Sequence, residues 1–409
     1  MDRPLEGIRV LEVAQYTFVP AAGAVLADWG ADIIKVEHAE TGDPQRGLVR
    51  VLGYDANRAG SSFAPIMEGP NRSKRSIGID LSVPEARPVL EELIRRSDVF
   101  LTNYLPGPRA KLGLTLEDVR AINPNIIYVT GSGFGSEGPD AASGAYDSTG
   151  FWARGGSAEG IMAPGADHVT FMPAGAYGDN IGGMTIAGGI AAAIAGRERT
   201  GEPSVVDVSL LGVAAWATQF TVNLALFTGG PLPKVQKTTQ AAGNPLTGAY
   251  RTADDRWLQF SMLQPTRFWN EFVMLLGLDH LVDDPRFATM AGITENAETI
   301  VSWFADAIAA RPYDEWTEIF QKLSGPWAPL QNSWELGHDQ ALVANGRIVD
   351  LVDADGESQQ LVANPVKFDN APVKMVRAPQ FAEHTDEILQ ELGIDDENLI
   401  GLKIAGAVT

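Results

Sequence analysis

The chain of 409 residues contains no cysteine. Disulfides, thiolate metal sites and a cysteine nucleophile are therefore all excluded. Basic residues are also scarce, because 31 Lys and Arg face 52 Asp and Glu, which gives a formal net charge of −21. Nucleic acid and anionic membranes both reward basic surfaces, so we expect neither as a main partner. A small anionic ligand is not excluded, since it needs only a local basic pocket.

Long hydrophobic runs are missing as well. Residues 1–14 carry several charges and no apolar core segment, so we expect no signal peptide. Residues 181–195 are apolar, but they are glycine-rich and shorter than the roughly 20 residues of a membrane span. These features predict a soluble, cytoplasmic protein. Its length exceeds one ordinary core, so two domains are the default.

A glycine-rich stretch, residues 175–189, sets Asp179 among residues too small to shield it. The Ala-rich run that follows ends at Gly201 after two arginines, as a buried helix with a basic last turn and a glycine stop would. Asp179 then lies at or just before the helix start, where Asp most often serves as an N-cap. Alternatively, the glycines let a substrate approach a reactive carboxylate, beside which free helix N–H groups favour negative charge. The stretch alone does not decide between these roles.

The first part of the chain alternates short apolar strands with helices, which predicts a parallel sheet of the α/β class. Ligands bind at the carboxyl ends of the strands in open sheets of this kind. We therefore expect a ligand-binding face made of the loops that follow the strands, which are residues 15–20, 38–42, 103–111 and 131–139. The last of these loops has neither the GxGxxG spacing nor the Lys-Ser/Thr of a phosphate-binding loop.

The domain division is expected from breaks in the chain. Residues 1–225 form the first part of the large domain, and a Gly-Gly-Pro-Leu-Pro break then opens a smaller α+β domain over 226–325. That domain is predicted to hold a hairpin and three amphipathic helices. Residues 326–409 lack a hydrophobic run long enough for their own core, so we expect them to return to the large domain.

Seven sequence blocks, in order along nearly the whole chain, resemble the family III CoA-transferases, a group with an isomerase branch, the α-methylacyl-CoA racemases. The blocks are PLEGIRVLE, GADIIKVEHAETGDPQRG, NRSKRSIGIDLSVPEA, NYLPGPRAKLGL, NPNIIYVTGSGFGSEGP, GDNIGGM and GNPLTGAYRTADDRWL. The resemblance implies a Rossmann-like large domain built from both chain ends, a smaller domain between them, and an interlocked homodimer. It implies acyl-CoA and a free carboxylic acid as substrates, and no metal.

The resemblance also implies that Asp179 is the nucleophile. A carboxylate that attacks an acyl-CoA thioester gives a mixed anhydride and CoA thiolate, which splits one hard exchange into easier steps. The thiolate then attacks the anhydride and leaves an aspartyl-CoA thioester until the acceptor acid takes over the CoA.

CoA contacts are implied at positions that match the family pattern, which are Thr17, Phe18, His38, Asp80, Leu81, Ser82, Asn103, Tyr104, Leu105, Lys111, Ala145, Tyr146 and Asp147. His38 stands where the family commonly has Arg, and a neutral His holds a phosphate more weakly. The CoA phosphate could instead be bound by Lys74, Arg75 or Arg109. Asp147 is also interpreted as a structural hydrogen-bond acceptor. The residues Ala242, Gly243 and Asn244 match the loop that closes over the intermediate.

Two other functions remain open. Racemases move an α-proton with two acid/base groups, one of them a His, but Tyr146 occupies that position here, and a Tyr with a pKa near 10 is a poor base at neutral pH. A CoA-thioester binding protein without turnover is the third candidate, against which the intact glycine-rich segment around Asp179 argues.

Overall fold

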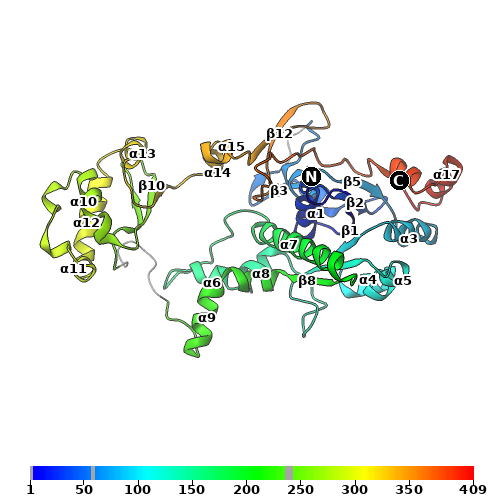
Figure 1. Ribbon diagram of the computed structural model, residues 1–409, viewed down its shortest axis with the longest axis horizontal. Coiled ribbons are helices and arrows are strands. Elements are labelled where there is room, and N and C mark those ends of the chain that lie inside the picture. The colour runs from blue at the N-terminus through cyan, green and yellow to red at the C-terminus, as the bar shows by residue number, and fades with distance from the viewer. Residues whose placement is uncertain (1–2, 57–59, 235–242) are drawn as a thin grey trace. The chain divides into compact units, whose positions relative to one another are not determined.

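The computed structural model describes residues 3–56, 60–234 and 243–409, which divide into two compact units. The large unit holds Met1–Met162, His168–Pro231 and Gln340–Thr409, and the small unit holds Ala163–Asp167 and Leu232–Asp339. Both ends of the chain therefore belong to the large unit (Figure 1).

The large unit is built on a six-stranded parallel sheet with the strand order β5-β2-β1-β6-β7-β8. Its strands are β1 (Arg9–Val13), β2 (Asp32–Glu37), β5 (Arg75–Gly78), β6 (Val99–Thr102), β7 (Ile127–Ser132) and β8 (Val205–Ser209). This is a doubly wound arrangement, in which the winding reverses between β1 and β6. The sheet confirms the α/β class expected from the alternating pattern.

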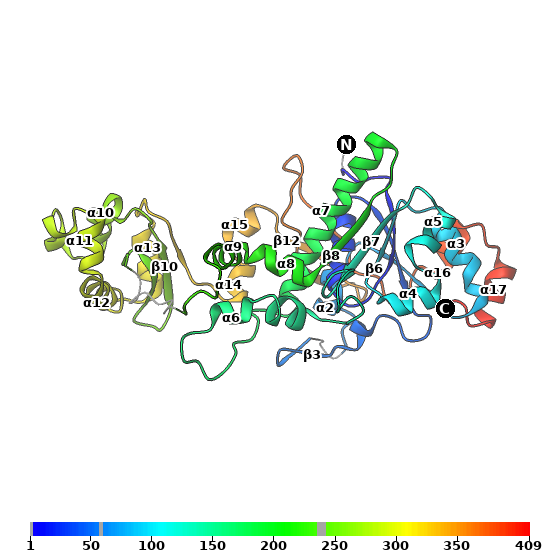
Figure 2. The ribbon, with the colours of Figure 1, turned by 90° about the horizontal axis from the view of Figure 1, so that it is seen from below.

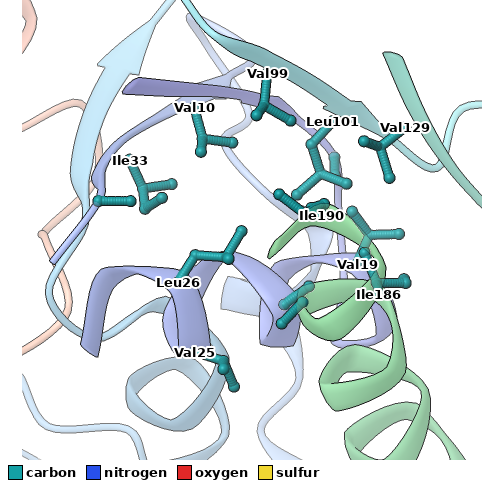
Figure 3. Close-up of a cluster of buried hydrophobic side chains, with 14 of the residues drawn as sticks. Val10, Val19, Val25, Leu26, Ile33, Val99, Leu101, Val129, Ile186 and Ile190 are labelled. Carbon is teal, nitrogen blue, oxygen red and sulfur yellow. The ribbon is translucent and has the colours of Figure 1, made fainter. Parts of the chain in front are cut away.

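Two hydrophobic clusters cover the two faces of this sheet. Neighbouring residues of β1 point to opposite faces, so Val10 belongs to the first cluster and Leu11 to the second. The first cluster packs the sheet against α1 (Phe18–Asp28) and α7 (Tyr177–Thr200), as Figure 3 shows. The second packs it against α3 (Arg87–Arg95), α5 (Leu116–Ile122), α16 (Thr385–Glu391) and α17 (Asp396–Ile404). Figure 2 shows α7 on one side of the strands and α3, α5 and α16 on the other.

The helix α7 confirms the expected helix after the glycine-rich stretch. It ends at Gly201 in the left-handed conformation, with a φ of 77°, so the glycine stop is as predicted. Its glycines also let it pack tightly on α1. A Cβ added at Gly183 would lie 2.6 Å from the Ala21 Cβ and 3.1 Å from the Ala22 backbone nitrogen.

The chain returns to the large unit through a hairpin, β12 (Ile348–Val352) and β13 (Ser358–Val362), followed by α16 and α17. Val408 forms a bridge with Ile79 just beyond β5, and the Asp80 N–H donates to the Ala407 carbonyl. Both Ala407 and Val408 are buried. The C-terminal segment thus completes the second hydrophobic cluster.

The remaining elements of the large unit are α2 (Pro65–Asn71), α4 (Pro106–Leu112), α6 (Ser157–Ile161), α8 (Leu210–Ala217), α9 (Gln219–Thr228), α15 (Gln340–Ala344) and the short hairpin of β3 (Arg50–Val51) and β4 (Tyr54–Asp55). The apolar stretch after β8 forms two helices, because the chain bends by 77° between α8 and α9. None of the described helices is long and apolar enough to cross a membrane alone, and this bent pair passes that test only jointly, by length and composition.

The small unit packs helices on a three-stranded antiparallel sheet, β11-β10-β9. Its elements are β9 (Thr247–Arg251), β10 (Trp257–Ser261), α10 (Pro265–Leu275), α11 (Met290–Glu295), α12 (Ala297–Ile308), α13 (Tyr313–Phe320), β11 (Trp327–Pro329) and α14 (Ser333–Gly337). Aromatic side chains dominate its core. Phe260 packs edge-on against Phe272 and Phe320, with ring centroids 5.0 and 5.1 Å apart.

Candidate active site

A cavity of about 750 Å³ opens in the large unit at the carboxyl ends of β1, β6, β7 and β8. It lies beside the point where the strand order reverses, the usual ligand position in a doubly wound sheet. Two hydrogen bonds join the loops there, because the Gln15 N–H donates to Asn103 Oδ1 (3.0 Å) and Asn103 Nδ2 donates to the Gln15 carbonyl (2.7 Å). The lining includes Gln15, Tyr16, Phe18, Asn103, Tyr104, Leu105, Arg109, Gly131, Ala145, Tyr146, Asp179, Asp207 and Leu210.

Asp179 lies in the first turn of α7, on the wall of this cavity. The N-cap interpretation of Asp179 is wrong, because the N-cap residue is Ala176 and makes no side-chain capping bond. Glycines bring the neighbouring elements close to the helix start. A Cβ at Gly178 would lie 2.4 Å from the Phe151 ring, and one at Gly182 would lie 2.3 Å from the Phe18 ring. The half-buried Asp179 carboxylate is thus left at the cavity surface between glycines.

The carboxylate of Asp179 holds its proton more tightly than an ordinary Asp. Burial, and then the nearby negative charge of Asp147, raise the pKa of Asp179 to about 7. Within the described residues, no ion pair or side-chain hydrogen bond offsets this effect. A carboxylate of this basicity is a stronger nucleophile than one with a pKa near 4, and at neutral pH much of it is still ionised.

Asp147 is buried behind Asp179, with 7% of its surface exposed. Burial raises its pKa, whereas the backbone N–H groups of Ser148, Gly178 and Tyr177 hydrogen-bond the carboxylate and oppose the rise. Two of these three donors belong to the first turn of α7, so the negative charge that the helix N–H groups accept beside Asp179 is that of Asp147. Its Oδ2 atom is buried and has no partner among the described residues. Asp147 is therefore placed to tune the charge of Asp179.

Arg109 is the only Lys or Arg among the described residues that line the cavity. It forms no ion pair with any described carboxylate, its Nε atom is buried without a partner, and Nη1 donates only to the Tyr128 hydroxyl at 3.4 Å. The other two cations considered for a phosphate are already paired. Lys74 is wholly buried with its Nζ 2.7 Å from Glu12 Oε2, and Arg75 binds Asp32 at 2.8 Å.

Several residues implied by the family resemblance line the cavity together with Asp179. They are Phe18, Asn103, Tyr104, Leu105, Ala145 and Tyr146. Asp147 lies just behind the wall.

The other implied CoA contacts lie outside the lining. His38 and the Asp80–Ser82 turn follow β2 and β5, so they lie at the same edge of the sheet, beyond the cavity. His38 Nε2 is 3.8 Å from Asp80 Oδ2, and the Ser82 hydroxyl donates to Asp80 Oδ1 at 2.6 Å. Leu81 packs at the border of the second cluster, Thr17 donates to Gln45 Oε1, and Lys111 is exposed. A role for these residues in CoA binding stays a prediction.

The implied substrate loop belongs to the small unit. Ala242 lies outside the described residues. A Cβ at Gly243 would lie 3.2 Å from Thr294 Cγ2, and Asn244 donates to the Met262 carbonyl at 2.9 Å while accepting from the Leu246 N–H at 3.0 Å. The amide of Asn244 is thus engaged within its own unit.

Asp207 and Tyr16 are cavity residues that the sequence analysis did not single out. Asp207 interrupts the apolar run of β8 and accepts from the Thr130 hydroxyl at 2.9 Å. A charged residue within an apolar strand was the available signal. Tyr16 falls within an expected loop, but nothing in that loop's sequence distinguished it. Among the described residues there is no cluster of three or more His, Asp or Glu that could hold a metal ion.

Known proteins resemble this chain over nearly its whole length. Residues 5–385 match the family described as CoA-transferase family III. The chain is 27% identical over 401 residues to the (R)-2-hydroxy-4-methylpentanoate CoA-transferase of Clostridioides difficile, covering 98% of both chains. It is 31% identical over 433 residues to the formyl-CoA:oxalate CoA-transferase of Streptomyces avermitilis, covering 100% of both.

A crystal structure of a CAIB/BAIF family protein from Brucella suis superposes with a TM-score of 0.82 at 26% identity, covering 96% of this chain and 100% of that one. The fold, the family match and both relatives agree over nearly the full length of the chain. This protein therefore belongs to CoA-transferase family III and is an enzyme of that family.

Proposed function

We propose that the enzyme moves CoA from an acyl-CoA donor to a free carboxylic acid through covalent intermediates on Asp179. The observation that carries this proposal is an unpaired carboxylate with a pKa of about 7 on the wall of a large cavity. The cavity is lined by mostly apolar groups and one free guanidinium, which suits a ligand with an acyl chain and an anionic part.

In the first step the ionised Asp179 carboxylate attacks the thioester carbonyl. The acyl C–S bond breaks, an acyl–aspartyl anhydride forms, and CoA leaves as a thiolate. The thiolate then attacks the aspartyl carbonyl of the anhydride, which releases the donor acid as a carboxylate and leaves an aspartyl-CoA thioester. The same two steps in reverse order, with the acceptor carboxylate as the incoming nucleophile, form the new acyl-CoA and regenerate Asp179.

Arg109 is proposed to hold an anionic group of CoA. A guanidinium without a carboxylate partner gains a charge-assisted hydrogen bond when a phosphate arrives, and its planar shape suits two-point contact. The cavity also contains the carboxylates of Asp179 and Asp207, so this single cation offsets their repulsion of an anionic ligand. CoA is proposed to extend from there along the sheet edge toward Asp80 and His38.

The proposed assembly is a homodimer with interlocked subunits. The helices α8 and α9 leave a large apolar surface exposed in the single chain, with Trp216 at 73%, Phe220 at 82% and Phe227 at 88% exposure. A soluble monomer rarely exposes such a patch, and a second copy of the chain would cover it. Sedimentation of the wild type should give twice the chain mass of 43.8 kDa, and Phe227→Asp should shift the equilibrium toward monomer.

The test of the transfer mechanism uses acetyl-CoA and a panel of free carboxylic acids in deuterated water, with both products identified by mass spectrometry. We expect new acyl-CoA species without α-deuterium. The Asp179→Ala variant should lose exchange while it keeps its circular dichroism spectrum and its affinity for CoA. Normal turnover by Asp179→Ala would refute the mechanism, and α-deuteration without exchange would assign the enzyme to the racemase branch.

A further inference from the structure

Charged side chains occupy the buried side of the turn between β1 and α1. Lys35 Nζ lies 2.8 Å from Asp43 Oδ2 and 3.4 Å from Glu12 Oε1. Lys74 Nζ lies 2.7 Å from Glu12 Oε2, and these four side chains are at most 1% exposed. Gly23 of α1 makes room for them, because a Cβ there would lie 2.0 Å from Glu12 Oε2. Buried ion pairs contribute little net stability, so the role of this network is better sought in the groups that it holds.

Two lysines of the network bind the backbone of the turn. Lys35 donates to the Ala14 carbonyl at 3.0 Å, directly after the end of β1. Lys74 donates to the Pro20 carbonyl at 2.8 Å, in the first turn of α1. Both ends of the segment from Ala14 to Pro20 are therefore attached to buried charges.

Asp43 holds the middle of the same segment. Its Oδ1 atom accepts from the Tyr16 N–H at 3.1 Å and from the Gln45 N–H at 2.9 Å. Tyr16 has a φ of 63°, in the left-handed region that bulky side chains rarely adopt. A residue in that region persists only where its surroundings over-determine it, and such residues cluster at functional sites. Asp43 supplies part of that constraint, although it lies outside the cavity lining.

Phe18 links this turn to the helix that carries Asp179. Its ring lines the cavity and lies close to both α7 and β7. A Cβ added at Gly182 would lie 2.3 Å from the ring, and one added at Gly131 would lie 3.1 Å from it. Gly182 follows Asp179 by three residues, so the two lie on the same face of α7. A shift of the turn would therefore move the Phe18 ring against the part of α7 that carries Asp179.

We propose that Asp43 is a positioning residue for the reaction of Asp179. By fixing the turn, Asp43 sets the place of the Phe18 ring, and the ring sets the distance and direction from the Asp179 carboxylate to the thioester carbonyl. This inference rests on the proposed function of Asp179. A displacement of about 1 Å costs a reacting group about a hundred-fold in rate, so the buried constraint favours the reaction even where its net effect on stability is small.

The kinetic test is Asp43→Ala, which removes the acceptor of the Tyr16 N–H, assayed with acetyl-CoA and the acid that exchanges fastest in the panel. We expect kcat to fall about ten-fold or more, whereas the affinity for CoA, measured by calorimetry, should change less than about two-fold.

The matched control is Asp28→Ala. Asp28 is likewise buried in an ion pair, with Arg72 at 2.7 Å, and it belongs to α1, but it lies outside the cavity lining. This control should lose thermal stability, because it leaves Arg72 without its carboxylate, and it should keep kcat within about two-fold of the wild type. A general loss of stability is thereby separated from a loss of positioning.

A double-mutant cycle tests the route through Phe18. Phe18→Leu keeps an apolar side chain but no longer fills the space against Gly182, so kcat should also fall about ten-fold. The variant that combines Phe18→Leu with Asp43→Ala should lie within about three-fold of the worse single variant, because both changes release the same part of α7. Amide hydrogen exchange over residues 177–182 should become faster in both single variants and stay unchanged in Asp28→Ala.

Several results would overturn the inference. They are an unchanged kcat in Asp43→Ala, losses that multiply to about a hundred-fold in the double variant, and a fall of kcat in Asp28→Ala as large as that in Asp43→Ala. If Asp43→Ala does not fold, Phe18→Leu decides alone, because a normal kcat and normal hydrogen exchange in that variant would refute the route.

Failure of the proposed function is distinguishable from failure of this inference. If Asp179→Ala keeps normal turnover while the Asp43 and Phe18 variants remain coupled, the nucleophile proposal fails and the constraint of Asp43 on α7 stands. If Asp179→Ala is inactive and Asp43→Ala keeps its kcat, the role of Asp43 alone is refuted.

Discussion

Asp179→Asn should make the fold more stable, and the gain should grow with pH. Burial and the charge of Asp147 raise the pKa of Asp179 from 3.8 to about 7, above its value in the unfolded chain. The protonated side chain therefore stabilises the native state. That contribution is fully present below about pH 4 and is lost as the pH rises through about 7. An asparagine side chain carries no charge at any of these pH values, so its contribution to stability does not fall as the pH rises.

The magnitude follows from the two pKa values. A rise from 3.8 to about 7 corresponds to roughly 4 kcal/mol between the limits. At pH 5.5 the native Asp179 is mostly protonated, and the expected advantage of asparagine is about 2 kcal/mol. At pH 8.5 it approaches about 4 kcal/mol. The increase of about 2 kcal/mol between the two values is the quantity to measure.

Urea denaturation of both proteins at pH 5.5 and 8.5, followed by circular dichroism, gives this quantity. The quantity compared is the difference in the free energy of unfolding between variant and wild type, at one pH and then at the other. The contribution of the small unit cancels in it, because the substitution lies in the large unit. The matched control is Asp207→Asn, because Asp207 lines the same cavity but accepts hydrogen bonds from the Thr130 hydroxyl and the Ser136 N–H. This control should destabilise the protein. An Asp179→Asn variant that is no more stable at pH 8.5 than the wild type would refute the reasoning.

Three further predictions concern charge and packing in the large unit. Asp147→Asn removes the negative charge beside the nucleophile, so the acid limb of the kcat/KM profile should move from about 7 to lower pH. An unmoved limb would show that burial alone sets the pKa. Arg109→Met should raise the KM for acetyl-CoA about ten-fold or more, whereas Lys111→Met, on the same helix but exposed, should change it less than about two-fold. The reverse ranking would favour the contact implied by the family resemblance. Gly183→Ala should cost about 1–3 kcal/mol in thermal unfolding because it pushes α7 from α1, whereas Gly188→Ala, with open space around it, should stabilise by about 0.5–1 kcal/mol.

The sheet and the principal helices could be predicted because their signals are local. Short apolar strands separated by helices specify a parallel sheet, and the Ala-rich run with Gly201 at its end specifies α7. The break at Thr218 carried no such signal. No Gly or Pro interrupts residues 213–228, so the sequence there gives no local sign of the bend between α8 and α9.

Three of the four expected loops, at residues 15–20, 103–111 and 131–139, contribute to one cavity together with Asp179, whereas residues 38–42 lie outside its lining. The details depend on contacts between distant residues. Glu12 and Lys35 lie within apolar strands where a charge predicts exposure, yet both are buried because each meets an opposite charge. Similarly, Arg109 and Lys111 look equivalent in sequence, and only the turn of α4 decides that Arg109 faces the cavity.

The return of the chain to the large unit affects how the protein is made. Residues 232–339 of the small unit are synthesised before residues 385–408, which close the second hydrophobic cluster and pair with Ile79 and Asp80. During translation, the face of the sheet that carries the second hydrophobic cluster therefore stays partly uncovered while more than a hundred intervening residues are added. Contacts so distant along the chain form slowly. The small unit has a hydrophobic core of its own. We therefore expect nascent chains to pass through a stage in which the small unit is folded and the large unit is not.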